Sequence, residues 1–395
     1  MLRALILLIV LIPLAIWLDR EQRAGRFQRV DELFLDFLVA NARDRLTTPD
    51  PAAPADAVVL LRIDPAQKNE YSAWPPQPLD WQIILKALRE HEPDVVVIPE
   101  PLTWPKPTPD FVPAVAESLV PLSSVVFGVE AQPASVEGMP VFMGGLENAL
   151  PRFEKAAGEI ARVPSIAALI QAPQEELRRH AELGLIIEKS LPYALRAEDR
   201  LLPGVIAQVL ARQSRTPYAT HRVLFGPGAG AHLQNGFFVP LQPDGSIAVD
   251  DKKTVITVNA LDLMSGGLAD ALSAKDRQHL QNASIIVIGQ DDEKQPGTAR
   301  RHAQALAGLL ALPRLRVLDE MEQRIAWGVF GLIGLWLVLT VPRRKSPARG
   351  LLLIFLTLVA LFLAFQSALV WFPPTIPAAL LSASAIIGAL LGRKA

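Results

Sequence analysis

The sequence contains no cysteine. This absence excludes disulfide bridges, metal sites with cysteine ligands, thiol catalysis and a lipidated cysteine anchor. Net charge is almost absent as well, because 39 Lys and Arg oppose 40 Asp and Glu and leave a formal charge of -1. The chain therefore has no overall basic field that could hold nucleic acid, and we expect no nucleic-acid partner.

The sequence patterns of common catalytic sites are missing too. The histidines are far apart, with no HExxH or HxH spacing, so nothing predicts a metal or another cofactor. The segment Gly226 to Gly230 is rich in glycine, but no Gly-Lys-Ser/Thr follows it, and no Gly-x-Ser-x-Gly elbow occurs. We therefore expect a protein that is not an enzyme.

Apolar residues, in contrast, are abundant: they make up 50% of the chain and form long uncharged runs near both ends. A membrane-spanning helix needs about 20 such residues. We expect four spans: a signal anchor at 1–18, then helices at 325–341, 350–372 and 374–391. The first run is short, which leaves a cleaved signal peptide as the alternative, but the bulky residues at its end disfavour cleavage.

The loops predict the orientation of these spans. The turn at 342–349 carries four cations and no acid, as is typical of a cytoplasmic loop. With four spans, both termini are then cytoplasmic, and the 19–324 region is periplasmic, on the outer side of a bacterial inner membrane. Four arginines oppose this arrangement because they follow the first helix on its outer side: Arg20, Arg23, Arg26 and Arg29.

The region between the apolar runs predicts an α/β fold. Two continuously apolar strands, 57–63 and 94–98, flank an amphipathic helix at 78–91, which is typical of a βαβ unit and a parallel sheet. We expect a mixed, mostly parallel sheet flanked by helices, with an antiparallel meander between 221 and 258. Further strands are predicted at 123–129, 184–187, 221–225, 236–240, 246–249, 254–258 and 284–289. Further helices are predicted at 30–45, 109–120, 163–171, 173–182, 203–212 and 300–312.

Acidic side chains follow three of the predicted strands. Asp64 and Glu100 each come after a strand, and Asp291, Asp292 and Glu293 follow a third. Because the carboxyl ends of parallel strands share one edge, these acids could form a single pocket for a cation or an amine. We favour the alternative, in which each acid is a solvated loop residue, as is common after strands.

Two other groups of side chains are candidates for ligand contact. His302 opens the last helix of this region behind the arginines at 300–301, where it could sense pH or hold an anion. A surface or helix-capping role is the alternative. Trp74, Trp81 and Trp104 lie near prolines and could line a ligand groove or fill the core.

The order of several segments resembles the CHASE type-2 (CHASE2) family, the extracytoplasmic sensory domains of bacterial cyclases, histidine kinases and serine/threonine kinases. The similar segments are Val58 to Asp64 with Trp74-Pro75, Val239 to Ser246, Asn259 to Gly266, and Ile285 to Gly289 with His302 to Leu310. The one-plus-three membrane layout is similar as well, so the resemblance covers nearly the whole chain. Three departures stand out. The family usually has Asp where this chain has Pro99-Glu100, and its usual Thr-Pro segment before the final His-Ala is shortened here to Gln290–Arg301. Family members also continue into a cytoplasmic output domain beyond the point where this sequence ends.

The resemblance implies a sensory protein rather than an enzyme. A periplasmic CHASE2-like domain would recognise an unknown small ligand and pass a signal through its transmembrane helices. The readout is then expected in a separate membrane or cytoplasmic signalling partner, with a homo-oligomer as a further possibility. The alternative is a structural or assembly subunit of a membrane complex that uses a degenerate sensory domain.

Overall fold

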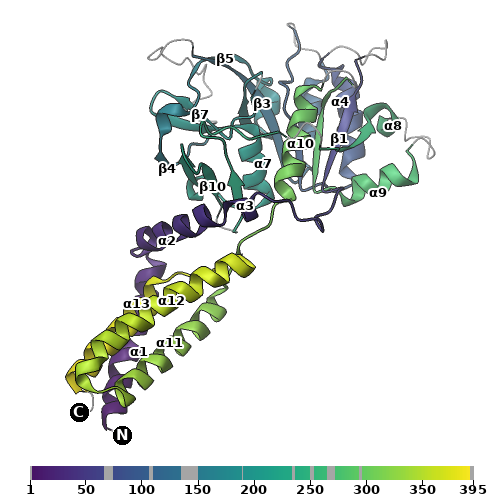
Figure 1. Ribbon diagram of the computed structural model, residues 1–395. Helices are drawn as coiled ribbons and strands as arrows, with labels where there is room; N and C mark the ends of the chain where they lie inside the picture. Colours follow the sequence, from purple (N-terminus) through teal and green to yellow (C-terminus); the bar gives the residue numbers. More distant parts are fainter. Residues whose placement is uncertain are drawn as a thin grey trace. The chain divides into compact units, whose positions relative to one another are not determined.

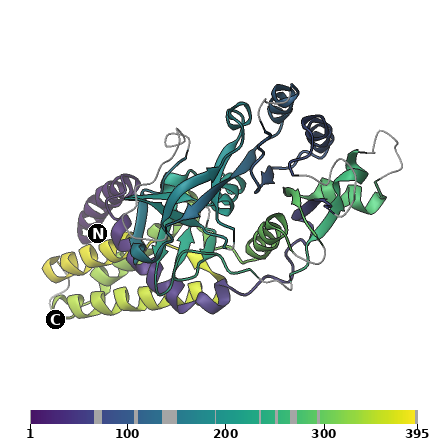
Figure 2. The ribbon, with the colours of Figure 1, turned by 90° about the horizontal axis from the view of Figure 1, so that it is seen from above.

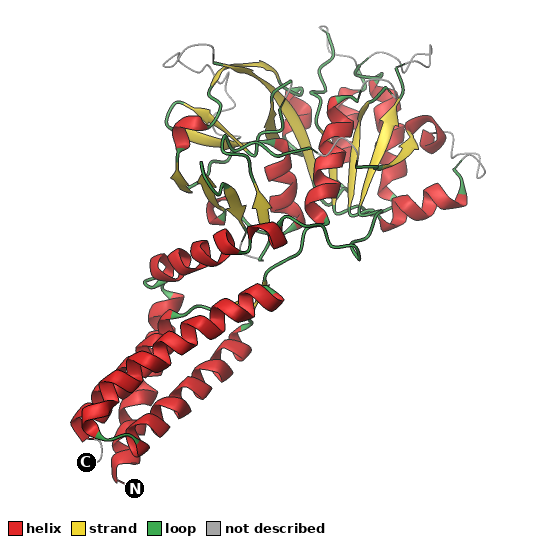
Figure 3. Ribbon diagram, viewed as in Figure 1, coloured by secondary structure: helices red, strands yellow, loops and turns green. Residues whose placement is uncertain are grey.

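The protein is described by a computed structural model that covers residues 2–65, 74–105, 110–134, 150–188, 190–233, 236–249, 253–264, 272–292 and 296–391. Its contacts divide the chain into two compact units (Figures 1 and 3). The helical unit combines Met1–Leu46 with Arg314–Ala395, and the α/β unit is Thr47–Pro313. Residues 19–46 therefore pack with the apolar helices rather than with the α/β unit.

The main sheet of the α/β unit has seven strands. They are β1 (Val58–Ile63), β2 (Val95–Ile98), β3 (Val125–Pro133), β5 (Ile166–Gln171), β6 (Glu182–Ile186), β12 (Ile256–Asn259) and β13 (Ile285–Gln290). Their spatial order is β12-β1-β13-β2-β3, and both β5 and β6 pair with β3. Every pairing is parallel except that of β5 with β3. The predicted mixed, mostly parallel sheet is confirmed.

Helices cover both faces of this sheet (Figure 2). One layer contains α4 (Pro78–Arg89), α5 (Val112–Leu119), α8 (Ala260–Met264) and α9 (Ala274–Asn282). The opposite layer contains α7 (Val205–Gln213) and α10 (Thr298–Leu310). The strands are buried on both sides, so alternate residues enter different cores: Val59 packs with the first layer and Val58 with the second. This double cover explains their unbroken apolar sequences.

The predicted antiparallel meander is confirmed in part. A second sheet has the order β11-β10-β9-β4, built from β4 (Lys155–Gly158), β9 (Arg222–Phe225), β10 (Gly230–His232) and β11 (Phe238–Pro240). The strands β9, β10 and β11 are antiparallel to their neighbours in this order, whereas β4 is parallel to β9. The predicted strand at 254–258 is instead β12, which joins the main sheet beside β1. Residues 246–249 form no strand; only Ser246 makes an isolated bridge, to Pro192.

The helix predicted at 163–171 is wrong, because this segment forms β5. Ile166 and Ile170 are spaced as on one face of a helix, but they lie in a strand that pairs with the end of β3. Tertiary pairing here overrides a short apolar pattern, for which helix and strand are hard to tell apart. The helix predicted at 173–182 shrinks to α6 (Glu175–Arg178), since β6 already begins at Glu182. The sequence also gave no indication of the β7 (Ala194–Ala197) and β8 (Arg200–Pro203) hairpin.

The helical unit contains α1 (Leu2–Arg23), α2 (Gln28–Asn41), α3 (Arg43–Leu46), α11 (Glu320–Thr340), α12 (Ser346–Ala368) and α13 (Thr375–Leu391). Two helices of the described residues are long and apolar enough to cross a membrane, Glu320–Thr340 and Arg343–Ala368, rather than the four predicted. The helix α13 has 17 residues and reaches only about 26 Å at 1.5 Å per residue. In α1 the charged residues from Asp19 onward shorten the apolar part.

The long helices of this unit turn large apolar side chains outward, unlike core helices of a soluble protein. Leu332 and Trp336 of α11 are 66% and 53% exposed, and Leu351 and Phe355 of α12 are 69% and 62% exposed. Contiguous apolar surface of this kind is typical of membrane-facing helices.

The helix α13 forms the centre of the helical unit. It contacts α1, α11 and α12, and its buried face includes Leu380, Leu381 and Ser384. The short parallel pair β14 (Arg316–Val317) and β15 (Val370–Trp371) joins the start of α11 to the start of α13. At the opposite end, the basic turn Arg343–Lys345 lies against α13, and the start of α1 and the end of α13 lie at this end (Figure 1).

Candidate functional site

Three of the predicted acidic positions meet at the carboxyl edge of the main sheet. In space β13 lies between β1 and β2, so Asp291 follows the strand between those that lead to Asp64 and Glu100. The backbone N–H of Asp291 donates to the carbonyl of Ile63 at 3.2 Å, and that of Gln290 donates to Glu100 Oε2 at 3.3 Å. The three acids thus follow neighbouring parallel strands, and Glu100 lies close enough to Asp291 to be affected by its charge. That all three acids form a single pocket stays a prediction.

Asp291 is already bound by the first turn of α10. Its side chain is fully buried and forms an ion pair with Arg300, whose Nε donates to Oδ2 at 2.8 Å. Its other oxygen accepts the N–H of Gly297 at 3.2 Å, immediately before the helix begins. Asp291 thus fixes the start of α10 to the end of β13, and Arg300 balances its charge. Asp292 follows it and is partly exposed, while Glu293 is outside the described residues.

Glu100 is the perturbed carboxyl group of this edge. Its pKa is raised to about 7, first by burial and also by the nearby charge of Asp291, against the opposing hydrogen bond from Gln290. Among the described residues no Lys, Arg or His lies within ion-pair distance of it. By contrast, Asp64 lies 4.0 Å from Arg62. Glu100 is therefore the acid at this edge that is best placed to respond to an added cation.

The backbone around Glu100 is closely packed. A Cβ on Gly289 would come 2.6 Å from the Cβ of Ala299 and 3.4 Å from Glu100 Oε2, so only glycine lets α10 and Glu100 approach β13 together.

Beside this edge, Trp104 Nε1 donates to the carbonyl of Pro76 at 2.8 Å, and Trp74 Nε1 donates to that of Pro101 at 3.2 Å.

These hydrogen bonds tie the segment after β2 to the segment before α4. Trp74 also meets Trp81 edge to face, with ring centroids 5.7 Å apart. Trp81 and Trp104 are buried, which favours the core role for these two over a groove lining.

His302 is buried within α10 and contacts the helix backbone rather than the acids of the sheet edge. It occupies the second turn of α10 rather than its start, is 3% exposed, and has its Nδ1 2.8 Å from the carbonyl of Thr298. Burial lowers its pKa to about 4, with Arg301 acting in the same direction, so the ring is neutral at physiological pH. This placement fits a core histidine rather than an anion ligand.

A buried polar cluster elsewhere was not predicted from the sequence. His221 is fully buried, with Nδ1 3.1 Å from the Tyr193 hydroxyl and Nε2 3.0 Å from the Thr216 hydroxyl. The Ser214 hydroxyl extends this hydrogen-bond network: it lies 2.6 Å from the Thr216 hydroxyl and donates to the carbonyl of Leu210. Both ring nitrogens of His221 are therefore engaged, and the arrangement fits a structural hydrogen-bond network. Its members have no recognisable spacing in the sequence, so no motif could have revealed it.

Two cavities of the α/β unit lie away from the acidic edge. One, of about 620 Å³, is bordered by Glu182, Gln208, Arg212 and Tyr218, and the other, of about 660 Å³, by Arg152, Arg196 and Asp199. Within the described ranges, no group of three or more His, Asp or Glu could hold a metal ion.

Comparison with known proteins adds no relative: the sequence matches no protein-family model, no curated protein and no solved structure.

Proposed function

We propose that this chain is a non-catalytic membrane sensory protein of the CHASE2 type, whose α/β unit recognises a small cationic ligand at the carboxyl edge of its main sheet. The observation that carries the proposal is Glu100, a carboxyl group with a pKa of about 7 beside the buried Asp291. An amine placed next to Glu100 would favour its ionised form. Ligand binding would therefore be coupled to proton release near neutral pH.

In this proposal the two long helices α11 and α12 cross a bacterial inner membrane, and the shorter apolar stretches of α1 and α13, which pack against them, cross it as well. The termini and the basic turn lie in the cytoplasm, and the α/β unit lies in the periplasm. The four cations at 342–349, without any acid, support this orientation. The four arginines at 20–29 oppose it less than their number implies, because Arg23 pairs with Asp19 at 3.2 Å and Arg26 with Glu21 at 2.8 Å. Large domains also cross largely regardless of charge.

A route for the signal follows the chain itself. Glu100 bonds the end of β13, and Asp291 ties β13 to the first turn of α10. The helix α10 ends at Leu310, and α11 begins at Glu320. A ligand that ionises Glu100 would strain or relieve the β13–α10 connection, and the covalent link would pass that change to α11. The receiving partner would be a separate membrane or cytoplasmic signalling protein, or a second copy of this chain.

Thermal unfolding of the full chain in detergent tests ligand recognition. The probes are ethanolamine, spermidine and Mg²⁺, with acetate as an anionic control, at pH values on either side of the Glu100 pKa. A ligand that binds the folded state raises Tm by mass action. We expect a cationic probe to raise the Tm of the wild type more above neutrality than below it, and to act less on Glu100→Gln. The matched control is Glu117→Gln, an exposed acid on α5. Equal shifts in all three proteins would refute the proposal.

A second function, that of an assembly subunit in a membrane complex, is favoured by one specific observation. Asp291 already has its charge balanced by Arg300, so part of the acidic edge serves the fold itself. In that case no cationic probe would raise Tm, and the chain would co-purify from membranes in a fixed ratio with another protein. Isolation as a lone monomer that no probe stabilises would contradict both functions.

A further inference from the structure

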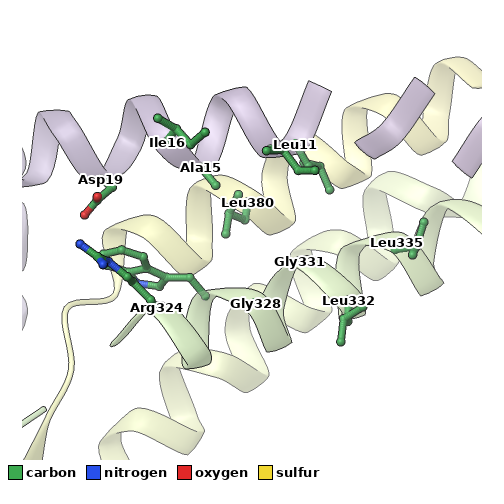
Figure 4. A pocket seen from close by; sticks show the side chains of 12 residues that line it. Leu11, Ala15, Ile16, Asp19, Arg324, Gly328, Gly331, Leu332, Leu335 and Leu380 are labelled. Carbon is green, nitrogen blue, oxygen red and sulfur yellow. The ribbon is translucent and has the colours of Figure 1, made fainter. Parts of the chain in front are cut away.

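A groove in the helical unit lies between α1, α11 and α13 (Figure 4). Its volume is about 410 Å³. Most of its wall is apolar, formed by residues such as Leu11, Ile16 and Leu332. Charge is confined to one end, where Asp19 of α1 and Arg324 of α11 face one another across the gap in Figure 4. The groove is thus amphiphilic along its length.

Two glycines of α11 keep the groove open. A Cβ placed on Gly328 or on Gly331 would meet nothing within 4 Å. The third glycine of this stretch, Gly334, behaves differently, because its Cβ would clash with the Ser384 hydroxyl on α13. Gly334 therefore allows α11 and α13 to pack closely, whereas Gly328 and Gly331 leave space in the groove that no residue of the described chain fills.

A polar group in the wall of the groove lacks a partner. Trp327 lines the groove, is 9% exposed, and its indole N–H has no acceptor among the described residues. It lies one helical turn from Arg324, hence close to the charged end. A buried donor without an acceptor is unfavourable, and tryptophans at the membrane interface commonly bond the polar part of a lipid.

We propose that this groove binds one phospholipid of the surrounding bilayer. An acyl chain lies along the apolar wall, an ester carbonyl accepts the Trp327 N–H, and a zwitterionic headgroup lies between Asp19 and Arg324. The volume is in the range of small-molecule sites. It is too small for a helix, which is about 10 Å across. The inference goes beyond the sensory function and depends only on the membrane placement of the helical unit.

The test counts the phospholipids that stay bound to the full chain after extraction in mild detergent, by native mass spectrometry. Gly331→Leu adds bulk at a groove-lining position where a Cβ meets nothing within 4 Å. Ala360→Leu adds similar bulk at an exposed position of α12 outside the groove. We expect the wild type and Ala360→Leu to retain one phospholipid per chain, and Gly331→Leu to lose it. Trp327→Phe keeps the apolar wall but removes the donor, so its lipid should dissociate at a lower detergent concentration.

Retention by Gly331→Leu equal to that of the wild type would overturn the proposal. So would a cross-link between a single cysteine at Gly328 and a second polypeptide in native membranes, because a helix would then occupy the groove. The native chain has no cysteine, so the label is unambiguous. Membrane fractionation separates the two levels of failure: a chain that stays in the membrane without bound lipid contradicts only this inference, whereas a chain absent from the membrane contradicts the placement as well.

Discussion

Asp31 and Thr375 join opposite ends of the sequence through a buried cap. The Asp31 carboxylate, on α2, accepts both the backbone N–H of Thr375 at 3.2 Å and its hydroxyl at 2.7 Å, at the first residue of α13. Its second oxygen accepts Gln22 Nε2 of α1 at 2.8 Å, and the residue is only 4% exposed. One side chain therefore connects α1, α2 and α13, and its negative charge meets the positive end of a helix dipole.

Replacing Asp31 should loosen the helical unit. Asp31→Ala leaves the N–H and the hydroxyl of Thr375 without their acceptor, and a cost of about 1–2 kcal/mol is expected from comparable caps. Glu32→Ala, on the same helix, removes an exposed contact with Gln28 and should lower the free energy of unfolding by only a few tenths of a kcal/mol. Denaturant unfolding of the purified chain in detergent measures both variants. A loss no larger for Asp31 than for Glu32 would show that the cap contributes little.

The position of α13 between its neighbours predicts a strong effect at Gly388. A Cβ there would overlap the hydroxyl of Ser346, which donates to the carbonyl of Ala385 at 3.0 Å. Gly388→Ala should therefore destabilise the helical unit by about 1–3 kcal/mol, as overpacking does. The same change at Gly328, where a Cβ has free space, should be neutral or stabilising because alanine favours helix. Thermal stability in detergent compares the two, and similar losses would contradict the close approach of α12 and α13.

The raised pKa of Glu100 makes the α/β unit less stable as pH rises. From about pH 4.5 to about pH 7 the carboxyl group is protonated in the folded state but ionised in the unfolded chain, so stability falls over this range. The slope is at most about 1.4 kcal/mol per pH unit, and the effect is complete above the folded pKa. The buried His221 and His302, with pKa values lowered to about 4, act in the opposite direction.

The readout is therefore the stability difference between Glu100→Gln and the wild type, in which the histidine contributions cancel. Chemical unfolding at a series of pH values should show that the free energy of unfolding of the variant, relative to that of the wild type, increases from acid to neutral pH. A difference that stays constant with pH would mean that Glu100 ionises normally.

The Asp291–Arg300 pair should be strongly coupled. Asp291→Asn leaves a mostly buried guanidinium without its carboxylate, and we expect a loss of about 2–4 kcal/mol. Arg300→Gln should also destabilise, because it leaves Asp291 unpaired. The double variant should cost less than the sum of the two single changes, which a double-mutant cycle measures directly. Strict additivity would indicate that the two side chains do not interact.

The proposed orientation predicts opposite accessibility for two single cysteines. Ala348→Cys lies in the first turn of α12 and keeps the four cations of the 342–349 segment, while Lys275→Cys lies at an exposed position of α9. In spheroplasts, a membrane-impermeant thiol reagent should label position 275 and leave position 348 unmodified until the membrane is disrupted. The reverse pattern would place the α/β unit in the cytoplasm.

The sequence predicted the sheet more reliably than the segments at its margin. Strands such as Val58–Ile63 and Ile285–Gln290 are apolar at nearly every position because both faces are covered, and that pattern is local. The acids after them could be placed on one edge for the same reason. By contrast, Ile166–Gln171 is a strand only because the end of β3 extends beyond β2 and offers it a partner. A short apolar segment does not contain that information.

By itself, the sequence determined the parallel α/β core, the apolar helices and the acidic edge, since each follows from the spacing of apolar and charged residues along the chain. Only the tertiary structure decided the state of each site. Asp64, Glu100 and Asp291 look alike in the sequence, yet Arg300 neutralises Asp291 while burial raises the pKa of Glu100. The cap between Asp31 and Thr375 and the groove beside Gly331 also depend on helices distant in the chain. Partner atoms set burial and electrostatics, and chain order does not reveal those partners.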